Sequence, residues 1–383
     1  KGAFRLKIVS MEPTPSPYTM KINVDEKLPD GQSENYKVND DVSNAPDYVQ
    51  QLFEINGVKG LYRVVDFIAL ERHPRVSWEE ILPEVRNVLG SEEETTELFS
   101  KAVKNEEQSF GEVKVLVQMI RNIPTQVKLQ DGEEEKRFAL PERFMDAAMK
   151  AAEASSNYLM ERTWVEQHPR YGKIDEIGKE VVEELSATYS EERLNELLQL
   201  ALKDETPTEV RVREKVTVEM LDHPDWRERY RVLDRIVDPT KDDYPVLNKA
   251  LDDEHSSVRR LATAYLGMIE DKETLPYLYK ALKDKSVNVR RTAGDCLSDL
   301  GYKEAIPKMI ESLSDESRIV RWRAAMFLYE VGDESAIPAL KKALDDPEFE
   351  VRMQAKMALQ RIEGGKEAEG SIWQQMAKVT KGK

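Results

Sequence analysis

In the C-terminal part of the chain, from about residue 206 to 363, apolar residues recur among polar ones with a helical period. Each block of this region predicts two helices. The first begins at a proline, which a first helical turn tolerates because the missing N–H is not needed there. The second begins at a Val-Arg pair, with apolar residues four, seven, eight and eleven positions after the valine, which indicates an amphipathic helix. One example is Val289, Ala293, Cys296, Leu297 and Leu300.

These blocks are internal repeats of 31 residues, and several columns keep the same register. The columns include Pro245, Pro276, Pro307 and Pro338; Val258-Arg259, Val289-Arg290, Val320-Arg321 and Val351-Arg352; and Ala262, Ala293, Ala324 and Ala355. A degenerate unit at 219–236 aligns with 342–359, and a divergent terminal repeat is expected because it lacks one neighbour. The pattern predicts an α-helical solenoid of about five hairpins. It resembles the short HEAT-like repeats of the phycobilin-lyase-like class in architecture, not in activity.

An aspartate column and an arginine column run through the repeats, for example Asp284 and Arg290. One interpretation is an anion-binding ridge. The favoured interpretation is a ladder of charge-assisted hydrogen bonds, in which an aspartate in a turn pairs with an arginine of its own or a neighbouring repeat.

The second helices also carry residues outside the apolar stripe, which change along the repeats from basic to aromatic and Met-rich. We expect these residues to form a partner-binding face, because exposed aromatic residues and Met are enriched in binding surfaces. The candidates are Arg260, Arg291, Trp322, Met326, Tyr329, Met353 and Met357. An equally weighted alternative is that the C-terminal segment covers this face, since Ile372, Met376 and Val379 share one helical side.

Residues 1–90 predict a small α/β domain. A strand-like alternation at 4–10 is followed by a turn-rich segment, a helix, a turn at Gly57–Gly60 and one strand through 62–68. Ser77, with Glu80 three residues later, predicts a capping box at the start of a further helix.

Within this domain the segment EPTPSPYTMK (12–21) resembles the T-P-N-P-x-T-x-K signature of the N-terminal domain of Nfu/NifU-type iron–sulfur scaffold proteins. The segment LFEINGV (52–58), the Asp66-Phe67-Ile68 strand and Trp78 match later elements of that domain in order and spacing, over about 85 residues. The motif residues are Pro13, Thr14, Pro15, Pro17, Thr19, Lys21, Phe53, Gly57, Asp66 and Phe67.

The Cys-x-x-Cys domain that holds the cluster in those scaffolds is absent from this sequence. A thiolate cluster needs several cysteines, and the sequence has one, Cys296, in a column predicted to be buried. An Nfu-like domain followed by HEAT-like repeats resembles the conserved virulence factor C family. That resemblance implies a regulatory phenotype and no particular biochemical activity.

Residues 91–205 predict a mostly helical α+β domain behind an acidic linker. Val113, Leu116, Val117 and Ile120 predict a helix at 112–121, and Asp131-Gly132 predicts a hairpin. Further helices are predicted at 141–155 and, as a pair, at 173–203, with Ser190 as an N-cap. We expect Trp164, His168 and Tyr171 in a loop that packs on the core, rather than lining a pocket.

Composition narrows the function. The 383 residues carry a formal net charge of −16, which disfavours nucleic-acid binding through phosphate neutralisation. No apolar run reaches the roughly 20 residues that span a membrane, so a cytoplasmic location is expected. Three of the four histidines, His73, His168 and His223, precede a proline and predict loops, and no metal-ligand pair is seen. The acidic pairs Glu79-Glu80 and Glu183-Glu184 are interpreted as solvated helix faces.

These observations predict a multidomain, mainly α protein: an Nfu-like α/β domain at 1–90, an α+β domain at 91–205, a solenoid at 206–363 and a tail at 364–383. No catalytic motif is recognised, and no cofactor is expected. The favoured function is a non-catalytic adaptor or regulatory scaffold that holds a protein partner, as a monomer or weak oligomer, without nucleic acid or membrane. The alternative is an accessory factor in iron–sulfur or metal handling that acts through the Nfu-like domain.

Overall fold

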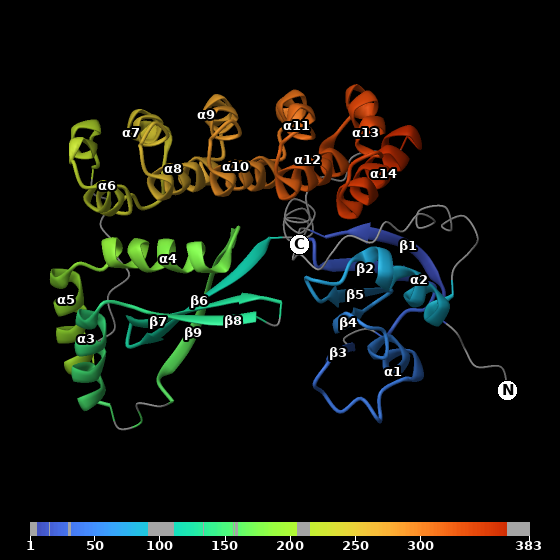
Figure 1. Cartoon of the computed structure of the whole chain (residues 1–383), viewed down its shortest axis with the longest axis horizontal. Coiled ribbons are helices and arrows are strands. Elements are labelled where there is room, and N and C mark those ends of the chain that lie inside the picture. The colour runs from blue at the N-terminus through green and yellow to red at the C-terminus, as the bar shows by residue number, and fades with distance from the viewer. Residues whose placement is uncertain are drawn as a thin grey trace. The chain divides into compact units, whose positions relative to one another are not determined.

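The computed structural model describes residues 6–14, 16–29, 32–90, 111–132, 134–155, 157, 160–204 and 215–365. The predicted acidic linker, Pro15 and the C-terminal segment with Ile372 lie outside these residues. The chain forms two compact units, one of Lys1–Phe110 with Lys303–Lys383 and one of Gly111–Tyr302. Small sheets with helices and a series of helical repeats make up the described residues, so the predicted fold class is confirmed (Figure 1).

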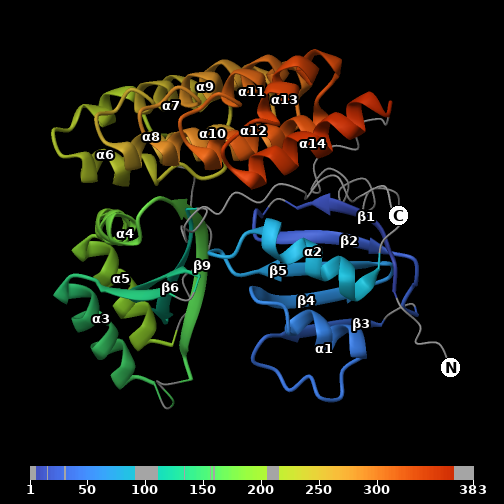
Figure 2. The ribbon, with the colours of Figure 1, turned by 45° about the vertical axis from the view of Figure 1, so that its right-hand side comes forward.

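The Nfu-like domain contains an antiparallel sheet. Its strands are β1 (Ile8–Pro13), β2 (Thr19–Val24), β3 (Ser33–Lys37), β4 (Val58–Val64) and β5 (Phe67–Arg72), in the order β1-β2-β5-β4-β3. The helices α1 (Asp47–Phe53) and α2 (Trp78–Leu89) lie on one face of it (Figure 2). Apolar side chains of alternate strand positions, such as Ile22 and Leu70, meet Ile81 and Val85 of α2 in the core.

The predicted strand through 62–68 is instead a hairpin of β4 and β5, with Val64 opposite Phe67. Its turn contains Val65 at a φ of +51°, a conformation that β-branched residues rarely adopt. The continuous apolar run hid this turn, because no glycine marks it. The helix predicted at Ser77 is present, and Ser77 Oγ accepts a hydrogen bond from Glu79 N at 3.2 Å.

The middle domain has an antiparallel sheet in the order β8-β7-β6-β9. The strands are β6 (Glu112–Ile120), β7 (Ile123–Asp131), β8 (Glu134–Ala139) and β9 (Arg162–Tyr171). The helices α3 (Glu142–Glu153), α4 (Ile174–Thr188) and α5 (Glu191–Leu202) share an apolar core with β6 and β7. The predicted Asp131-Gly132 hairpin, the helices at 141–155 and 173–203 and the Ser190 N-cap are confirmed.

Two predictions in this domain are wrong. Residues 112–120 form β6 and not a helix: Val113, Val115 and Val117 are buried at alternate positions, and period two overrides the helical spacing of Val113, Leu116 and Ile120. Trp164, His168 and Tyr171 belong to strand β9 and not to a loop, even though His168 precedes a proline. Pro169 is tolerated because β9 is an edge strand.

Helical hairpins follow in both units. The unit of residues 111–302 contains the 3₁₀ turn η2 (Val218–Asp222) with α6 (Trp226–Leu233), α7 (Tyr244–Ala250) with α8 (Ser256–Met268), and α9 (Leu275–Ala281) with α10 (Val287–Leu300). The other unit contains α11 (Ile306–Ser312) with α12 (Arg318–Val331) and α13 (Ile337–Ala343) with α14 (Phe349–Glu363). A proline stands at the start of each first helix from α7 to α13, as the sequence predicts. In the degenerate unit the first helix is reduced to η2.

Candidate partner-binding surface

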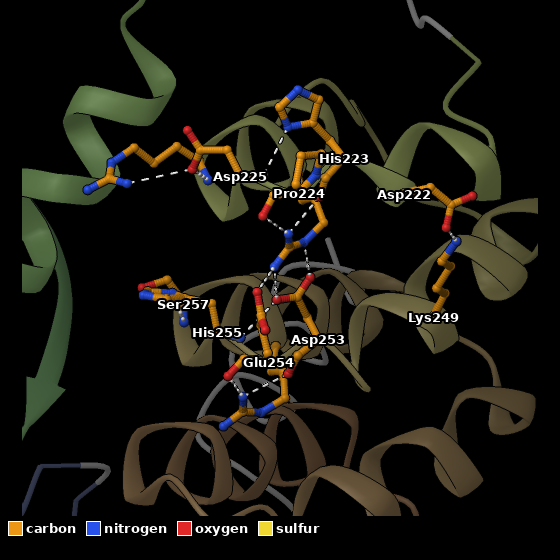
Figure 3. Close-up of polar contacts among 12 residues, drawn as sticks. Asp222, His223, Pro224, Asp225, Lys249, Asp253, Glu254, His255 and Ser257 are labelled. Carbon is orange, nitrogen blue, oxygen red and sulfur yellow. Dashed lines mark hydrogen bonds and ion pairs between the residues drawn. The ribbon is translucent and has the colours of Figure 1, made fainter.

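The arginine column of the repeats is a structural ladder. The Arg229 guanidinium donates to both carboxylate oxygens of Asp253 in the next repeat, at 2.6 and 2.9 Å, and to the carbonyls of His223 and Pro224 (Figure 3). The hydrogen bond to Asp253 is the main cause that raises the pKa of Arg229.

The same pattern recurs in later repeats. Arg259 donates to Asp284 at 2.7 and 3.0 Å, and Arg321 donates to Asp346 at the same two distances. In each case the partner is the aspartate of the following repeat, one of the two pairings that the sequence left open. Because these guanidinium groups donate their hydrogen bonds to turn carbonyls and to aspartate carboxylates, the ladder interpretation holds for these residues.

In the unit of residues 111–302, the candidate Arg260 is buried. It lies on α8 and contacts Glu184 of α4, with its Nη2 3.1 Å from Glu184 Oε2. Arg170 at the end of β9 approaches the same oxygen to 2.6 Å. Ser257 Oγ donates to Glu180 Oε1, one turn earlier on α4, at 3.1 Å. We call Glu180, Glu184, Arg170, Arg260 and Ser257 the Glu184 cluster.

The predicted solvated face is therefore wrong for Glu184, which is 4 % exposed. Burial alone would raise the pKa of Glu184, but Arg260 and Arg170 hold it below its usual value, so this carboxylate is ionised. Burial and the charge of Glu184 raise the pKa of Glu180. The cluster thus places the cations Arg170 and Arg260 beside the ionised Glu184 and the weaker acid Glu180. It also joins α4 to α8.

The candidate Arg291 of α10 is also buried and is engaged by the middle domain. Its guanidinium lies 4.9 Å from the centre of the Tyr171 ring, and it forms an ion pair with Asp295. Tyr171 Oη donates to Asp295 Oδ2 at 3.2 Å, and Tyr171 N donates to Asn288 Oδ1 at 2.8 Å. The end of β9 is therefore fixed to α10.

In the other unit, the remaining candidates are not exposed. Trp322 and Met326 are 2 % and 1 % exposed, and Met353 and Met357 are buried. Met353 and Met357 belong to the same apolar core as the Nfu-like domain, with Tyr329 packed against it. The expected exposure of this face is therefore wrong, and for Met353, Met357 and Tyr329 the covering part is a domain of the chain itself. Periodicity within one helix carries no information on such a distant contact.

A buried ion pair accompanies this apolar contact. Arg72, at the end of β5, donates from Nη2 to Glu350 Oε1 of α14 at 3.2 Å, and Ser77 Oγ lies 3.3 Å from the same oxygen. The remaining nitrogens of Arg72 donate to backbone carbonyls, the shortest at 2.6 Å to Val76. Glu79, predicted to be solvated, is largely buried and lies 3.9 Å from Arg352. Its burial raises its pKa.

Several Nfu-like motif residues organise the turn between β1 and β2. Thr14 Oγ1 lies 3.0 Å from Ser16 O and 2.9 Å from Thr19 O. The Pro17 carbonyl accepts from Trp78 Nε1 at 3.0 Å and from Arg72 Nε at 3.3 Å. The motif thus links this turn to α2 and to the Arg72 contact. Pro13 ends β1.

The other motif residues have separate roles. Gly57 adopts a φ of +94°, and an added Cβ would lie 2.6 Å from Val76, so this turn requires glycine. Phe53 packs at the rim of the core. The Asp66 carbonyl accepts from Val24 N at 2.8 Å. Lys21 forms an ion pair with Glu12 at 2.8 Å and lies 5.2 Å from the centre of the Phe67 ring.

Lys21 and Phe67 lie on the sheet face opposite to α1 and α2. The register places Lys21 beside Ala69 and Ala69 beside Tyr62, and it places Asn23 beside Phe67 and Phe67 beside Val64. Tyr62 is 42 % exposed. We call these six residues the outer sheet face. It combines aromatic and apolar groups in two short rows with one lysine at the side.

Within the described residues, no group of three or more His, Cys, Asp or Glu side chains could hold a metal ion. Likewise, no described helix is long and apolar enough to cross a membrane. Cys296 is buried on α10, with Sγ 3.6 Å from the Thr263 carbonyl.

Comparisons with known proteins agree with this arrangement. Family models match for the virulence factor family at 118–198, the N-terminal domain of scaffold protein Nfu/NifU at 9–95, and HEAT repeats at 214–293 and 278–360. Conserved virulence factor C of Staphylococcus saprophyticus is 43 % identical over 269 residues, which cover 70 % of each chain. The chain belongs to the conserved virulence factor C family. The Bacillus subtilis protein YpgR, described as uncharacterized, is 55 % identical over 268 residues, 69 % of this chain and 70 % of its own.

Solved structures resemble separate parts of the chain. Staphylococcus aureus protein SAV1430 is 34 % identical and covers 21 % of this chain and 96 % of its own, with a TM-score of 0.20. The YIBA_ECOLI protein is 19 % identical over 59 % of this chain and 77 % of its own, with a TM-score of 0.34. Human deoxyhypusine hydroxylase is 22 % identical over 48 % of this chain and 62 % of its own, with a TM-score of 0.30.

Proposed function

We propose that this protein is a non-catalytic adaptor in which, within each compact unit, the HEAT-like repeats of that unit support its α/β domain. A protein partner then docks on the outer sheet face of the Nfu-like domain. The observation that carries this proposal is the burial of the repeat residues that would otherwise bind a partner. Met353 and Met357 pack in the core of the Nfu-like domain, and Arg260 pairs with α4 of the middle domain.

The contacts within each unit support a permanent frame. Glu350 and Glu184 are both buried, and each is paired with arginine from an α/β domain. Removal of one member of a buried pair leaves an uncompensated charge, which costs about 3–5 kcal/mol. An external partner that competed for these helix faces would have to overcome that cost, so a free surface elsewhere is the better docking site.

The outer sheet face has the composition of such a site. Tyr62 and Phe67 offer rigid aromatic surface. Ala69 lies beside Tyr62, and Val64 lies beside Phe67. Tyrosine and other aromatic residues contribute most to the binding energy in many interfaces. Lys21 forms an ion pair with Glu12, so this lysine adds little net charge to the face.

The test is affinity purification of the full chain from its native cell, with quantitative mass spectrometry. Tyr62→Ala with Phe67→Ala should lower recovery of a specific partner by about tenfold or more, because two aromatic anchors are lost. Met268→Ala is the matched control, since Met268 is 56 % exposed on a repeat helix and lies outside the outer sheet face. Unchanged recovery with the double variant, shown by circular dichroism to be folded, refutes the proposed surface.

A second function, accessory handling of iron–sulfur clusters or metals, has one observation in its favour. The Nfu/NifU model matches residues 9–95, and its motif residues Lys21 and Phe67 lie on the outer sheet face. Such a role requires an assembly protein to dock on this face and to supply the cluster ligands. Anaerobic reconstitution with iron, sulfide and candidate assembly proteins should then give docking or transfer that Tyr62→Ala with Phe67→Ala removes. Equal transfer with and without this protein contradicts the role.

A further inference from the structure

Strand β9 is an edge of the middle-domain sheet, and most of its residues are exposed. It pairs with β6 on one side. At the opposite edge, α4 packs on one face of β8: the Phe138 ring lies against Gly178, and Lys136 Nζ donates to Asp175 Oδ2 at 2.9 Å. The end of β9 at Tyr171 is held on α10, but its preceding residues are not part of the domain core.

The open part of β9 is long and exposed on both faces. Residues 162, 163 and 165–169 are exposed, and Val165 is 43 % exposed although its neighbour Val117 on β6 is buried. An edge strand presents alternate backbone N–H and C=O groups away from its neighbour. These groups can form hydrogen bonds with an added strand. Residues of high β-propensity such as Thr163, Trp164 and Val165 favour the extended conformation that such pairing needs.

The side chains of this segment are complementary to those of a second copy. In an antiparallel pair centred on Trp164, Arg162 stands opposite Glu166 of the other copy, and Thr163 stands opposite Val165. Two-fold symmetry produces each pair twice. Opposite charges and β-branched pairs in these positions are favourable cross-strand neighbours.

The two registers shifted toward the C-terminal end of β9 are poorer. A pair centred on Val165 places Arg162 opposite His168 and Trp164 opposite Glu166, so the ion pairs are lost. A pair centred on Glu166 places two carboxylates opposite each other, and like charges there are destabilising. Of these three registers, the sequence of the exposed edge favours the one centred on Trp164.

We propose that β9 is a self-association site, through which two copies of this chain pair antiparallel about Trp164 and join their sheets. The site is independent of the outer sheet face and of the adaptor function. The net charge of −16 on each copy opposes the association. The dimer is therefore weak, and it forms at physiological ionic strength, where the Debye length is about 8 Å and distant charges are screened.

The first experiment is sedimentation equilibrium of the full chain with charge variants. Glu166→Arg should raise the dimer dissociation constant about tenfold or more, since symmetry replaces two ion pairs by two like-charge contacts. Adding Arg162→Glu to this variant should restore the wild-type constant, because the pairs are reversed. Lys114→Gln is the matched control: it removes the ion pair that Glu166 forms within one chain, at 2.9 Å, and leaves the constant unchanged.

The second experiment tests the register by disulfide formation. A mixture of Thr163→Cys and Val165→Cys chains should form a disulfide-linked dimer, because these positions are opposite each other only between copies in the proposed register. Each variant alone should cross-link several-fold less, and the wild type, whose Cys296 is buried, should not cross-link. A wild type that stays monomeric, a double charge variant that does not regain the dimer, or cross-linking that is independent of mixing overturns the proposal.

Discussion

Replacement of Glu184 by glutamine tests whether a buried charge holds the middle domain on the repeats. Glu184 is 4 % exposed and lies 2.6 Å from Arg170 and 3.1 Å from Arg260. The substitution preserves the shape of the side chain but removes its charge. Two buried guanidinium groups then face Glu180 alone, whose pKa is already raised by burial.

The magnitude follows from the burial of the partners. Breaking a buried ion pair by removing one member costs about 3–5 kcal/mol, and glutamine retains a hydrogen-bond acceptor, so about 3 kcal/mol is expected for Glu184→Gln. The preceding residue provides a matched control. The Glu183 side chain is 45 % exposed and pairs with Arg227, which is 43 % exposed. Exposed pairs contribute about 0–1 kcal/mol, so Glu183→Gln should have little effect.

Urea unfolding followed by circular dichroism measures the change in unfolding free energy for both variants. Hydrogen exchange, read by mass spectrometry on peptides of α4 and α8, locates the loss of protection. We expect faster exchange in both helices for Glu184→Gln and wild-type exchange for Glu183→Gln. If the two variants are equally stable, the burial of the Glu184 cluster does not determine its energetics and the reasoning is refuted.

Four further substitutions, one of them measured over a pH series, test other parts of the structure. Gly267→Ala should lower the free energy of unfolding, measured in urea, by about 1–3 kcal/mol, because its Cβ would lie 2.2 Å from Cys296 Sγ. Adding Cys296→Ala should recover part of the loss. A Gly267→Ala variant that is more stable than the wild type contradicts the close packing of α8 on α10. Val65→Gly should stabilise by about 0.5–1 kcal/mol, because Val65 is 43 % exposed and its φ is +51°; a lower melting temperature contradicts the strain. The hydrogen bond from Arg121 lowers the pKa of Glu161 from 4.5 to about 2. Because the pKa of Glu161 is lower in the folded state, the contribution of its ionised form to stability is complete above pH 4.5 and is lost as the pH falls toward 2. The difference in unfolding free energy between wild type and Glu161→Gln should therefore narrow over that range. A constant difference would argue against the contact with Arg121.

Much of the repeat region was determined by sequence alone. The 31-residue columns, the prolines at first-helix starts and the pairing of arginine with an aspartate one repeat away are local or nearest-neighbour properties, and each recurs often enough to be recognised. The Nfu-like motif can be recognised in the sequence for a related reason. Gly57 meets a backbone requirement that few residues satisfy, and the Thr14 hydroxyl bonds to the backbone of its own turn.

Only the tertiary structure decided which repeat residues are covered. Glu183 and Glu184 are adjacent and chemically identical in sequence, yet one is solvated and the other is buried, because Glu184 faces Arg260 of α8, which lies 76 residues away in the chain. Periodicity describes the packing of a helix within its own repeat, so it predicts exposed positions for Met357 and Trp322, which the structure buries. Residues 112–120 satisfied both helical and strand spacing, and hydrogen bonding to β7 and β9 selected the strand. Long-range contacts that leave no periodic trace in the chain therefore set both the location of the free surfaces and the open edge at β9.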